Sequence, residues 1–224
     1  MAFELDLGLR PEGKNGARVR SLDSYRAYFE KWADTWEYQA LLRARVISGS
    51  PELIASFTEL IDRFRYPAEL TSKQLLEIRR IKARVETERL PQGADPARHL
   101  KLGKGSISDV EWLVQLYQLR LAHGQPDLRV LGTLEALDSL EKSGEVSKED
   151  AQVLRAAWLL SSRCRSALVL AVDKLVDILP TDRGQLEAMS RILEFAPGSA
   201  SELEETYLST TRKARAVYEK LFAK

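Results

Sequence analysis

The segment SISDVEWLVQLYQLRLAH, residues 106–123, predicts the helix on which the rest of the chain packs. Its apolar side chains recur every three or four residues, at Val110, Leu113, Val114, Tyr117 and Leu121. Further apolar side chains cover most of the remaining circumference, namely Trp112, Leu116 and Leu119. Because a helix that is apolar on nearly all sides is buried, we expect this one at the centre of the fold.

The same helical period extends over most of the chain on both sides of this segment. In residues 71–90 the apolar stripe predicts a buried face, and we expect Glu77 and Lys82 on the solvated face with their charged neighbours. Further helices are expected from Ser21 with a break between Trp32 and Ala40, and over 50–64, 129–143, 148–176, 183–195 and 200–222. The sequence therefore predicts a mainly α protein.

Only the beginning of the chain shows the two-residue period of a β-strand. Phe3, Leu5, Leu7 and Leu9 alternate with small or polar residues, which places Asp6 on the opposite face. After turn residues at 10–16, residues 17–20 fit a second short strand, and residues 43–47 fit either helix or strand. We expect a part with this short β element at 1–50 and a helical domain at 51–224.

Composition excludes several classes of protein. The 34 Lys and Arg residues nearly balance the 33 Asp and Glu residues, so no overall charge directs the chain to nucleic acid. The single cysteine, Cys164, excludes a disulfide framework within the chain and favours a reducing compartment. The longest apolar run, residues 167–172, is far shorter than the roughly twenty residues of a membrane helix. We therefore expect a cytoplasmic protein without a nucleic-acid or membrane partner. His99 and His123 have no carboxylate or cysteine beside them at the spacing of metal ligands, so neither predicts a metal site.

Two segments carry residues suited to binding phosphate. In the segment KLGKGSISDVE, the loop of Lys101, Gly103, Lys104 and Gly105 offers amides and ammonium groups to an anion. Asp109 and Glu111 follow at a spacing that would hold two metal ions on a strand. On a helix, residues two apart diverge by about 200 degrees, so we favour a role for both in the first helical turn.

The second segment is WEYQALLRAR, residues 36–45. Arg43 and Arg45 fit either a pair that binds phosphate oxygens or two exposed side chains at the end of an amphipathic helix. The residues alone leave both readings open.

In their order, three segments resemble the glutamine synthetase adenylyltransferase/adenylyl-removing enzyme family. The first is LDLGLRPEG at residues 5–13, which contains Asp6 and Arg10; the second includes Trp36, Glu37 and Gln39; the third is the glycine-containing segment from Lys101 to Trp112. Residues 78–86 and 207–216 look most like the carboxyl-terminal, adenylylating half of the actinobacterial form.

The resemblance implies an ATP- and Mg²⁺-dependent nucleotidyltransferase that attaches AMP to a tyrosine of glutamine synthetase, with a PII-type signal protein as a further partner. It gives Asp6 the role of the third metal-site carboxylate and makes residues 1–50 the end of a nucleotidyltransferase core. The other two carboxylates precede this position in the family, so we expect the chain alone to be inactive. The adenylyl-removing half, or a helical module that docks a protein without catalysis, are the alternatives.

Overall fold

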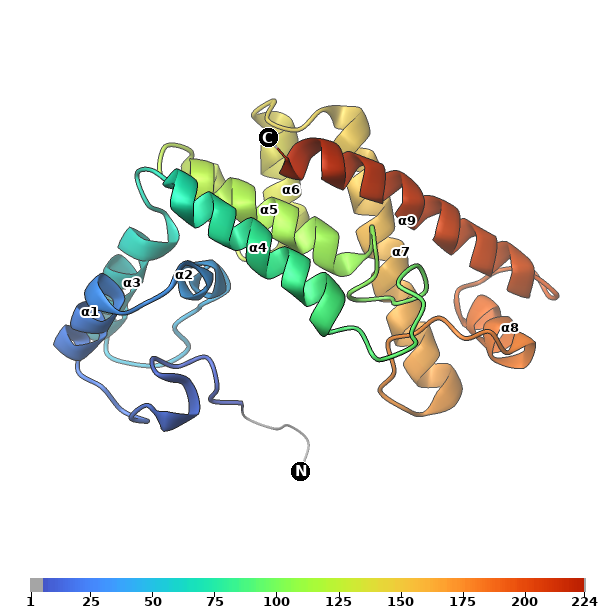
Figure 1. The fold of residues 1–224 in the computed structure, drawn as a ribbon, viewed down its shortest axis with the longest axis horizontal. Helices are drawn as coiled ribbons and strands as arrows, with labels where there is room; N and C mark the ends of the chain where they lie inside the picture. The colour runs from blue at the N-terminus through green and yellow to red at the C-terminus, as the bar shows by residue number, and fades with distance from the viewer. Residues whose placement is uncertain (1–5, 224) are drawn as a thin grey trace. The chain divides into compact units, whose positions relative to one another are not determined.

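The computed structural model describes residues 6–223, and nearly all of its regular structure is helical (Figure 1). The α-helices are α1 (Leu22–Lys31), α2 (Thr35–Leu41), α3 (Pro51–Arg65), α4 (Ser72–Glu88), α5 (Ile107–Leu121), α6 (Thr133–Lys142), α7 (Lys148–Val172), α8 (Arg183–Ile192) and α9 (Ala200–Phe222). Two short 3-10 helices, Gly13–Asn15 and Pro126–Leu128, complete the set. The expectation of a mainly α protein is confirmed.

Several helices begin where the sequence predicts a cap. Ser21 accepts a hydrogen bond from the Ser24 amide ahead of α1, and Ser50 accepts one from the Leu53 amide ahead of α3. The chain turns at Asp173, whose left-handed conformation ends α7 before the expected residue 176. Among the described residues, no helix is both long and apolar enough to cross a bilayer.

The short β element is not seen in the part of the chain that the structure describes. Residues 6–9 and 17–20 lie in turns and irregular structure, while residues 3–5 fall outside the described range. A two-residue period sets only the side-chain alternation, whereas a strand also needs a backbone partner. Here the Arg10 guanidinium donates to the carbonyl oxygens of Leu7, Lys14 and Gly16, at 2.6, 2.8 and 3.0 Å, and this supports a compact loop.

The chain forms two compact units. Unit 1 contains residues 1–79 and 117–131, and unit 2 contains residues 80–116 and 132–224. Both α4 and α5 contribute residues to each unit. The expected domains, residues 1–50 and 51–224, were drawn from the resemblance of sequence segments and not from compactness. That division stays a prediction.

Unit 1 is held together by aromatic side chains. The Phe29 ring lies 5.3 Å from the Phe64 ring, and the Tyr25 ring meets Phe57 edge-on at 5.3 Å. Tyr38 of α2 stacks on Phe64 at 5.6 Å. These contacts join α1 and α2 to α3, as edge and stacked aromatic pairs commonly do in small cores.

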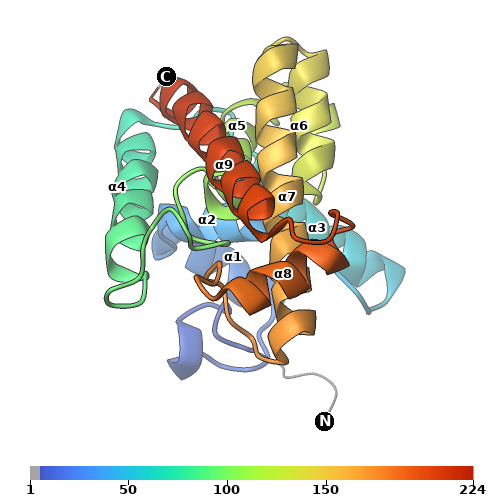
Figure 2. The same ribbon diagram turned by 90° about the vertical axis from the view of Figure 1, so that its right-hand side faces the viewer.

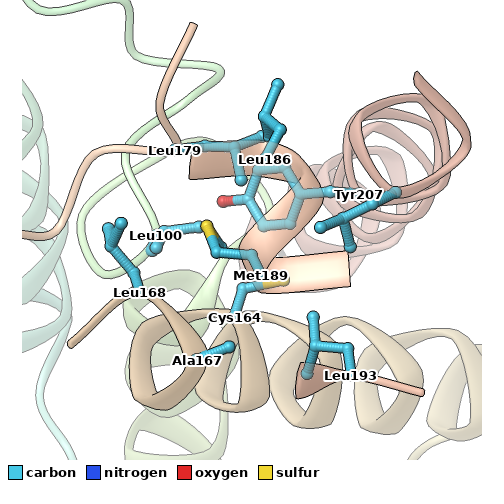
Figure 3. Close-up of a cluster of buried hydrophobic side chains, with 10 residues drawn as sticks. Leu100, Cys164, Ala167, Leu168, Leu179, Leu186, Met189, Leu193 and Tyr207 are labelled. Atoms are coloured by element: carbon cyan, nitrogen blue, oxygen red, sulfur yellow. The ribbon is translucent and has the colours of Figure 1, made fainter. Parts of the chain in front are cut away.

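Unit 2 contains an extended aliphatic core. Helices α7, α8 and α9 pack against one another, and α7 and α9 lie side by side in both ribbon views (Figures 1 and 2). Figure 3 shows Cys164 and Leu168 of α7 facing Leu186 and Met189 of α8, with Tyr207 of α9 beside them. Burial raises the pKa of the Cys164 thiol to about 12, so the cysteine is a core side chain.

Candidate functional site

The N-terminal loop places Asp6 at the surface. Its carboxylate is exposed and accepts a 2.8 Å hydrogen bond from the Gly8 amide. Arg10 is half-buried, and its guanidinium donors are engaged by the three carbonyl groups of its own loop. In this conformation Arg10 shapes the loop next to Asp6.

A two-metal site needs several carboxylates that converge on the ions. Between residues 6 and 223, no three His, Cys, Asp or Glu side chains gather in the way that metal ligands do. The described residues therefore do not fit a two-metal centre by themselves, and the role of Asp6 as one ligand stays a prediction.

The second segment forms α2, and its acidic residue makes structural bonds. Glu37 is 9% exposed and closes a capping box, because one carboxylate oxygen accepts the Asp34 amide at 2.8 Å. The other oxygen accepts the Tyr28 hydroxyl at 2.7 Å. Burial, and then the hydrogen bond to Glu37, raises the pKa of Tyr28. Glu37 thus joins α1 to the start of α2.

The remaining residues of this segment differ in exposure. Gln39 is buried, Arg43 is half-buried, Arg45 is exposed, and Trp36 is 40% exposed. The carbonyl groups at the end of α2 are bound by Arg65 of α3, which donates to Leu41 at 3.2 Å and Ala44 at 2.9 Å. Arg45, exposed next to this capped end, is accessible to a ligand.

The glycine segment forms a tight loop in unit 2 because two of its residues have no side chain. A Cβ on Gly105 would lie 1.8 Å from the Thr211 carbonyl oxygen of α9, and the Gly105 φ angle is +74°. A Cβ on Gly103 would lie 2.2 Å from the His99 carbonyl oxygen. Only glycine allows this backbone to approach α9 and itself so closely.

The Asp109 carboxylate binds one of the loop amides that we expected to face an anion. Asp109 is 1% exposed and accepts the Gly105 amide at 2.6 Å. It also accepts Lys82 of α4 at 2.5 Å and Arg215 of α9 at 3.0 Å. One buried carboxylate therefore fixes the loop, α4 and α9 to the start of α5.

Glu86 completes this buried charge cluster of Lys82, Glu86, Asp109 and Arg215. It accepts Lys82 and Arg215, each at 2.9 Å. Burial alone would raise the pKa of Glu86, but the hydrogen bonds from Arg215 and Lys82 outweigh it and lower that pKa. Two positive and two negative groups balance one another, as buried charges require.

Lys82 is buried, although the sequence predicts it on the solvated face of residues 71–90. It is 2% exposed, and its nitrogen lies 5.5 Å from the centroid of the Tyr218 ring. Burial raises the pKa of Tyr218, so this side chain stays uncharged beside the cluster. The i,i+4 spacing of Lys82 and Glu86 is visible in sequence, but it is equally typical of a surface pair.

The other residues of the glycine segment lie around this cluster with different exposure. Lys101 and Lys104 are exposed, and Glu111 is half-buried. Ser106 donates to the carbonyl oxygens of Lys101 at 3.0 Å and Gly103 at 2.8 Å, so it binds the loop. The structure brings Gly103, Gly105 and Asp109 together in unit 2, whereas Asp6, Arg10, Arg43 and Arg45 belong to unit 1.

Two family models match this chain, one over most of its helical part and one over its beginning. The family model described as GlnD PII-uridylyltransferase matches residues 54–222, and that described as Glutamate-ammonia ligase adenylyltransferase matches residues 1–60. The chain thus belongs to the GlnD PII-uridylyltransferase family, in the form related to bifunctional glutamine synthetase adenylyltransferase/adenylyl-removing enzymes.

The relatives that support this assignment carry the name of the bifunctional enzyme. The one from Leifsonia xyli is 58% identical over 99% of this chain and 22% of its own length. Those from Corynebacterium glutamicum and Mycobacterium tuberculosis are 50% and 47% identical over 98% of this chain, which covers 21% and 22% of their lengths. The chain spans about a fifth of the relatives that it matches.

Proposed function

We propose that this chain is a helical part of an enzyme that adenylylates glutamine synthetase and so regulates nitrogen assimilation. The observation that carries the proposal is similarity over nearly the whole chain to enzymes named for that activity, at 47–58% identity. The resemblance of residues 78–86 and 207–216 to the carboxyl-terminal half supports assignment to the adenylylating half. ATP would be the nucleotide, a tyrosine of glutamine synthetase the acceptor, and Mg²⁺ the metal.

The described geometry supports different roles for the expected site residues. Asp6 is exposed and accessible as a metal ligand, and Arg45, Lys101 and Lys104 are exposed and accessible to phosphate. Asp109 serves instead as a positioning residue, because its carboxylate is enclosed by Lys82, Arg215 and the Gly105 amide. Mg²⁺ would supply neutralisation of phosphate charge when bound.

Label transfer from ATP tests the proposal. The 224 residues alone, incubated with α-labelled ATP, Mg²⁺ and glutamine synthetase, should transfer no label, because their described carboxylates form no two-metal site. Joining them to the preceding segment of the Leifsonia xyli relative should produce labelled tyrosine. Steady transfer by the chain alone, or no transfer by the joined protein, would contradict the proposal.

A matched pair of variants in the joined protein tests Asp6. Asp6→Asn should abolish label transfer, because it removes a charged ligand. Asp23→Asn serves as the control, since Asp23 is an exposed carboxylate that binds Arg26 at 3.0 Å. Equal activity of both variants would remove Asp6 from the metal site.

The adenylyl-removing half is separated from the adenylylating half by the direction of the reaction. We expect no release of labelled AMP or ADP when the joined protein meets adenylylated glutamine synthetase, Mg²⁺ and phosphate. Release with phosphate but no transfer from ATP would assign the chain to the adenylyl-removing half.

Two exposed tryptophans favour a second candidate function, the docking of a protein partner. Trp32 is 75% exposed and Trp36 is 40% exposed, and exposed aromatic side chains are common where proteins associate. Glutamine synthetase or a PII-type protein is the partner to test. Binding without nucleotide that is lost in Trp32→Ser, but kept when exposed Leu170 is changed to Ser, would support this function.

A further inference from the structure

We propose that His99 is a positioning residue, which acts through Lys101 when the glycine loop of residues 101–106 binds the phosphate groups of a nucleotide. This role rests on the proposed function and deepens it, because it states which groups of the loop can contact phosphate and what holds them. All the residues concerned belong to unit 2.

The backbone amides of the glycine loop are already bound within unit 2. Their acceptors are His99 Nδ1 for Lys101 and Leu102, the His99 carbonyl for Gly103, the Pro96 carbonyl for Lys104, the Asp109 carboxylate for Gly105 and the Gly103 carbonyl for Ser106. An amide paired in this way would have to give up its hydrogen bond to bind phosphate. The loop therefore offers an anion its side chains, and Lys101 and Lys104 are its exposed cations.

The backbone of Lys101 is fixed at both ends. Its amide donates to His99 Nδ1 at 3.3 Å, and the Leu102 amide donates to the same nitrogen at 3.1 Å. The Lys101 carbonyl oxygen accepts the Ser106 hydroxyl at 3.0 Å and the Ser108 amide at 2.9 Å. Because the backbone sets the direction of the Cα–Cβ bond, His99 limits where the Lys101 ammonium group can reach. Such preorganisation reduces the entropy lost on binding.

His99 is itself held in place and uncharged. It is 4% exposed, and it forms an antiparallel bridge with Ile178. The charged and titratable groups around it are Asp177, Arg165, Lys101 and Tyr207. Burial lowers the pKa of His99, although the charge of Asp177 opposes this effect. The imidazole is therefore neutral near pH 7, and its Nδ1 can accept the two amides.

Two substitutions at His99 separate the hydrogen bonds from the shape of the ring. His99→Phe keeps an aromatic ring and removes the acceptor. His99→Asn keeps an acceptor, since Asn side chains commonly bind the backbone two residues ahead, and it does not titrate. Equilibrium dialysis of labelled ATP with Mg²⁺ against the joined protein measures the effect of each change.

We expect His99→Phe to weaken ATP binding by about fivefold, which corresponds to the net strength of one ordinary hydrogen bond. His99→Asn should bind ATP as the unchanged joined protein does. The control is His123→Phe, at an exposed histidine outside the loop, which should also bind normally. Normal binding in His99→Phe, or equal losses in the Phe and Asn variants of His99, would overturn the proposal.

A double substitution tests whether His99 acts through Lys101. Lys101→Met should weaken ATP binding, and the addition of His99→Phe should cause no further loss, because the side chain to be positioned is gone. Independent losses at the two positions would overturn the proposal.

The pH dependence of ATP binding gives a readout that a merely structural role would not move. Protonation places a hydrogen on Nδ1, which then faces two amide donors. Below the ordinary value of about 6.5, binding should therefore weaken more steeply in the unchanged protein than in His99→Asn. Identical pH profiles would overturn the proposal.

Amide hydrogen exchange controls for folding. In His99→Phe, exchange should speed up at Lys101 and Leu102 and stay slow at Ala151, whose amide donates to the Ser147 carbonyl at the start of α7. Label transfer reports separately on the proposed function. Transfer combined with normal ATP binding in His99→Phe would overturn only the role of His99, whereas weakened binding in this variant and no transfer by the unchanged joined protein would overturn only the proposed function.

Discussion

Helix α2 and the glycine loop both have the composition of a phosphate-binding segment, but different forces hold them. The main polar bonds of α2 reach nearby residues, since Glu37 binds the Asp34 amide and the Tyr28 hydroxyl. The loop depends on partners far away in sequence, because Asp109 binds Lys82, 27 residues before it, and Arg215, 106 residues after it.

This difference shows that two segments with similar sequence patterns can rely on the rest of the fold to different extents for their local structure. The α2 segment carries its own cap and should keep its local structure when distant contacts are changed. The loop has its shape only when α4, α5 and α9 are already packed. Disturbing the charge cluster should therefore damage unit 2 more than disturbing the capping box damages unit 1.

The largest effect is expected from Asp109→Asn. The change leaves Lys82 and Arg215 buried with one carboxylate fewer, and breaking a buried charge pair in this way costs about 3–5 kcal/mol. Denaturant unfolding would measure it. Asp150→Asn is the control, because its partner Lys220 is largely exposed and such a pair contributes about 1 kcal/mol or less. Equal losses in the two variants would contradict the importance of the cluster.

Gly105→Ala should come next. The new Cβ would lie 1.8 Å from the Thr211 carbonyl oxygen, so α9 or the loop must move. Gly93→Ala provides a matched control, with a similar φ of +77° and no atom within 4 Å. Both variants place alanine in a left-handed backbone conformation, which destabilises each of them. The clash should lower the unfolding free energy of Gly105→Ala by about 1–3 kcal/mol more than that of Gly93→Ala. No difference would mean that the close approach is not needed.

Glu37→Ala should have a smaller effect. It removes the acceptor of the Asp34 amide and of the Tyr28 hydroxyl, and loss of a helix cap typically costs about 1 kcal/mol. Thermal unfolding compared with Glu30→Ala, an exposed glutamate on α1, would measure this cost. A loss as large as that in Asp109→Asn would reverse the comparison between the two segments.

The acid dependence of stability should report the cluster directly. The pKa of Glu86 is lower in the folded protein, so its contribution is complete above the unfolded value of about 4.3. That contribution is lost as the pH falls through the lower folded value. Unfolding free energies below about pH 4.3 should thus fall less steeply in Glu86→Gln than in the unchanged protein. Glu88→Gln, which removes an exposed carboxylate from the same helix, is the control.

Lys104→Ala should have the smallest effect on folding. The side chain is exposed, and such changes usually alter stability by less than about 0.5 kcal/mol. If Lys104 contacts phosphate, the same change should reduce label transfer in the joined protein. A large loss of unfolding free energy would instead make this lysine part of the scaffold of the loop.

The helices could be predicted from particular sequence signals. Proline after Ser50 marks the start of α3, and the apolar stripes around Val110 place α5 in the core. The N-terminal strand was wrong over the described residues 6–9, because side-chain alternation gives no information about a partner for the backbone. The burial of Lys82 could not be predicted, since its partners Asp109 and Arg215 lie outside its helix.

The sequence by itself determined the helical character, the main helix boundaries and the resemblance of the three motif segments to a family, because these depend on local spacing and residue type. Only the tertiary structure decided that Asp109 faces inward and that its carboxylate is enclosed by Lys82, Arg215 and the Gly105 amide. The physical reason is that the helix dipole favours a carboxylate at the start of a helix whether it faces water or buried cations, and long-range packing selects between the two.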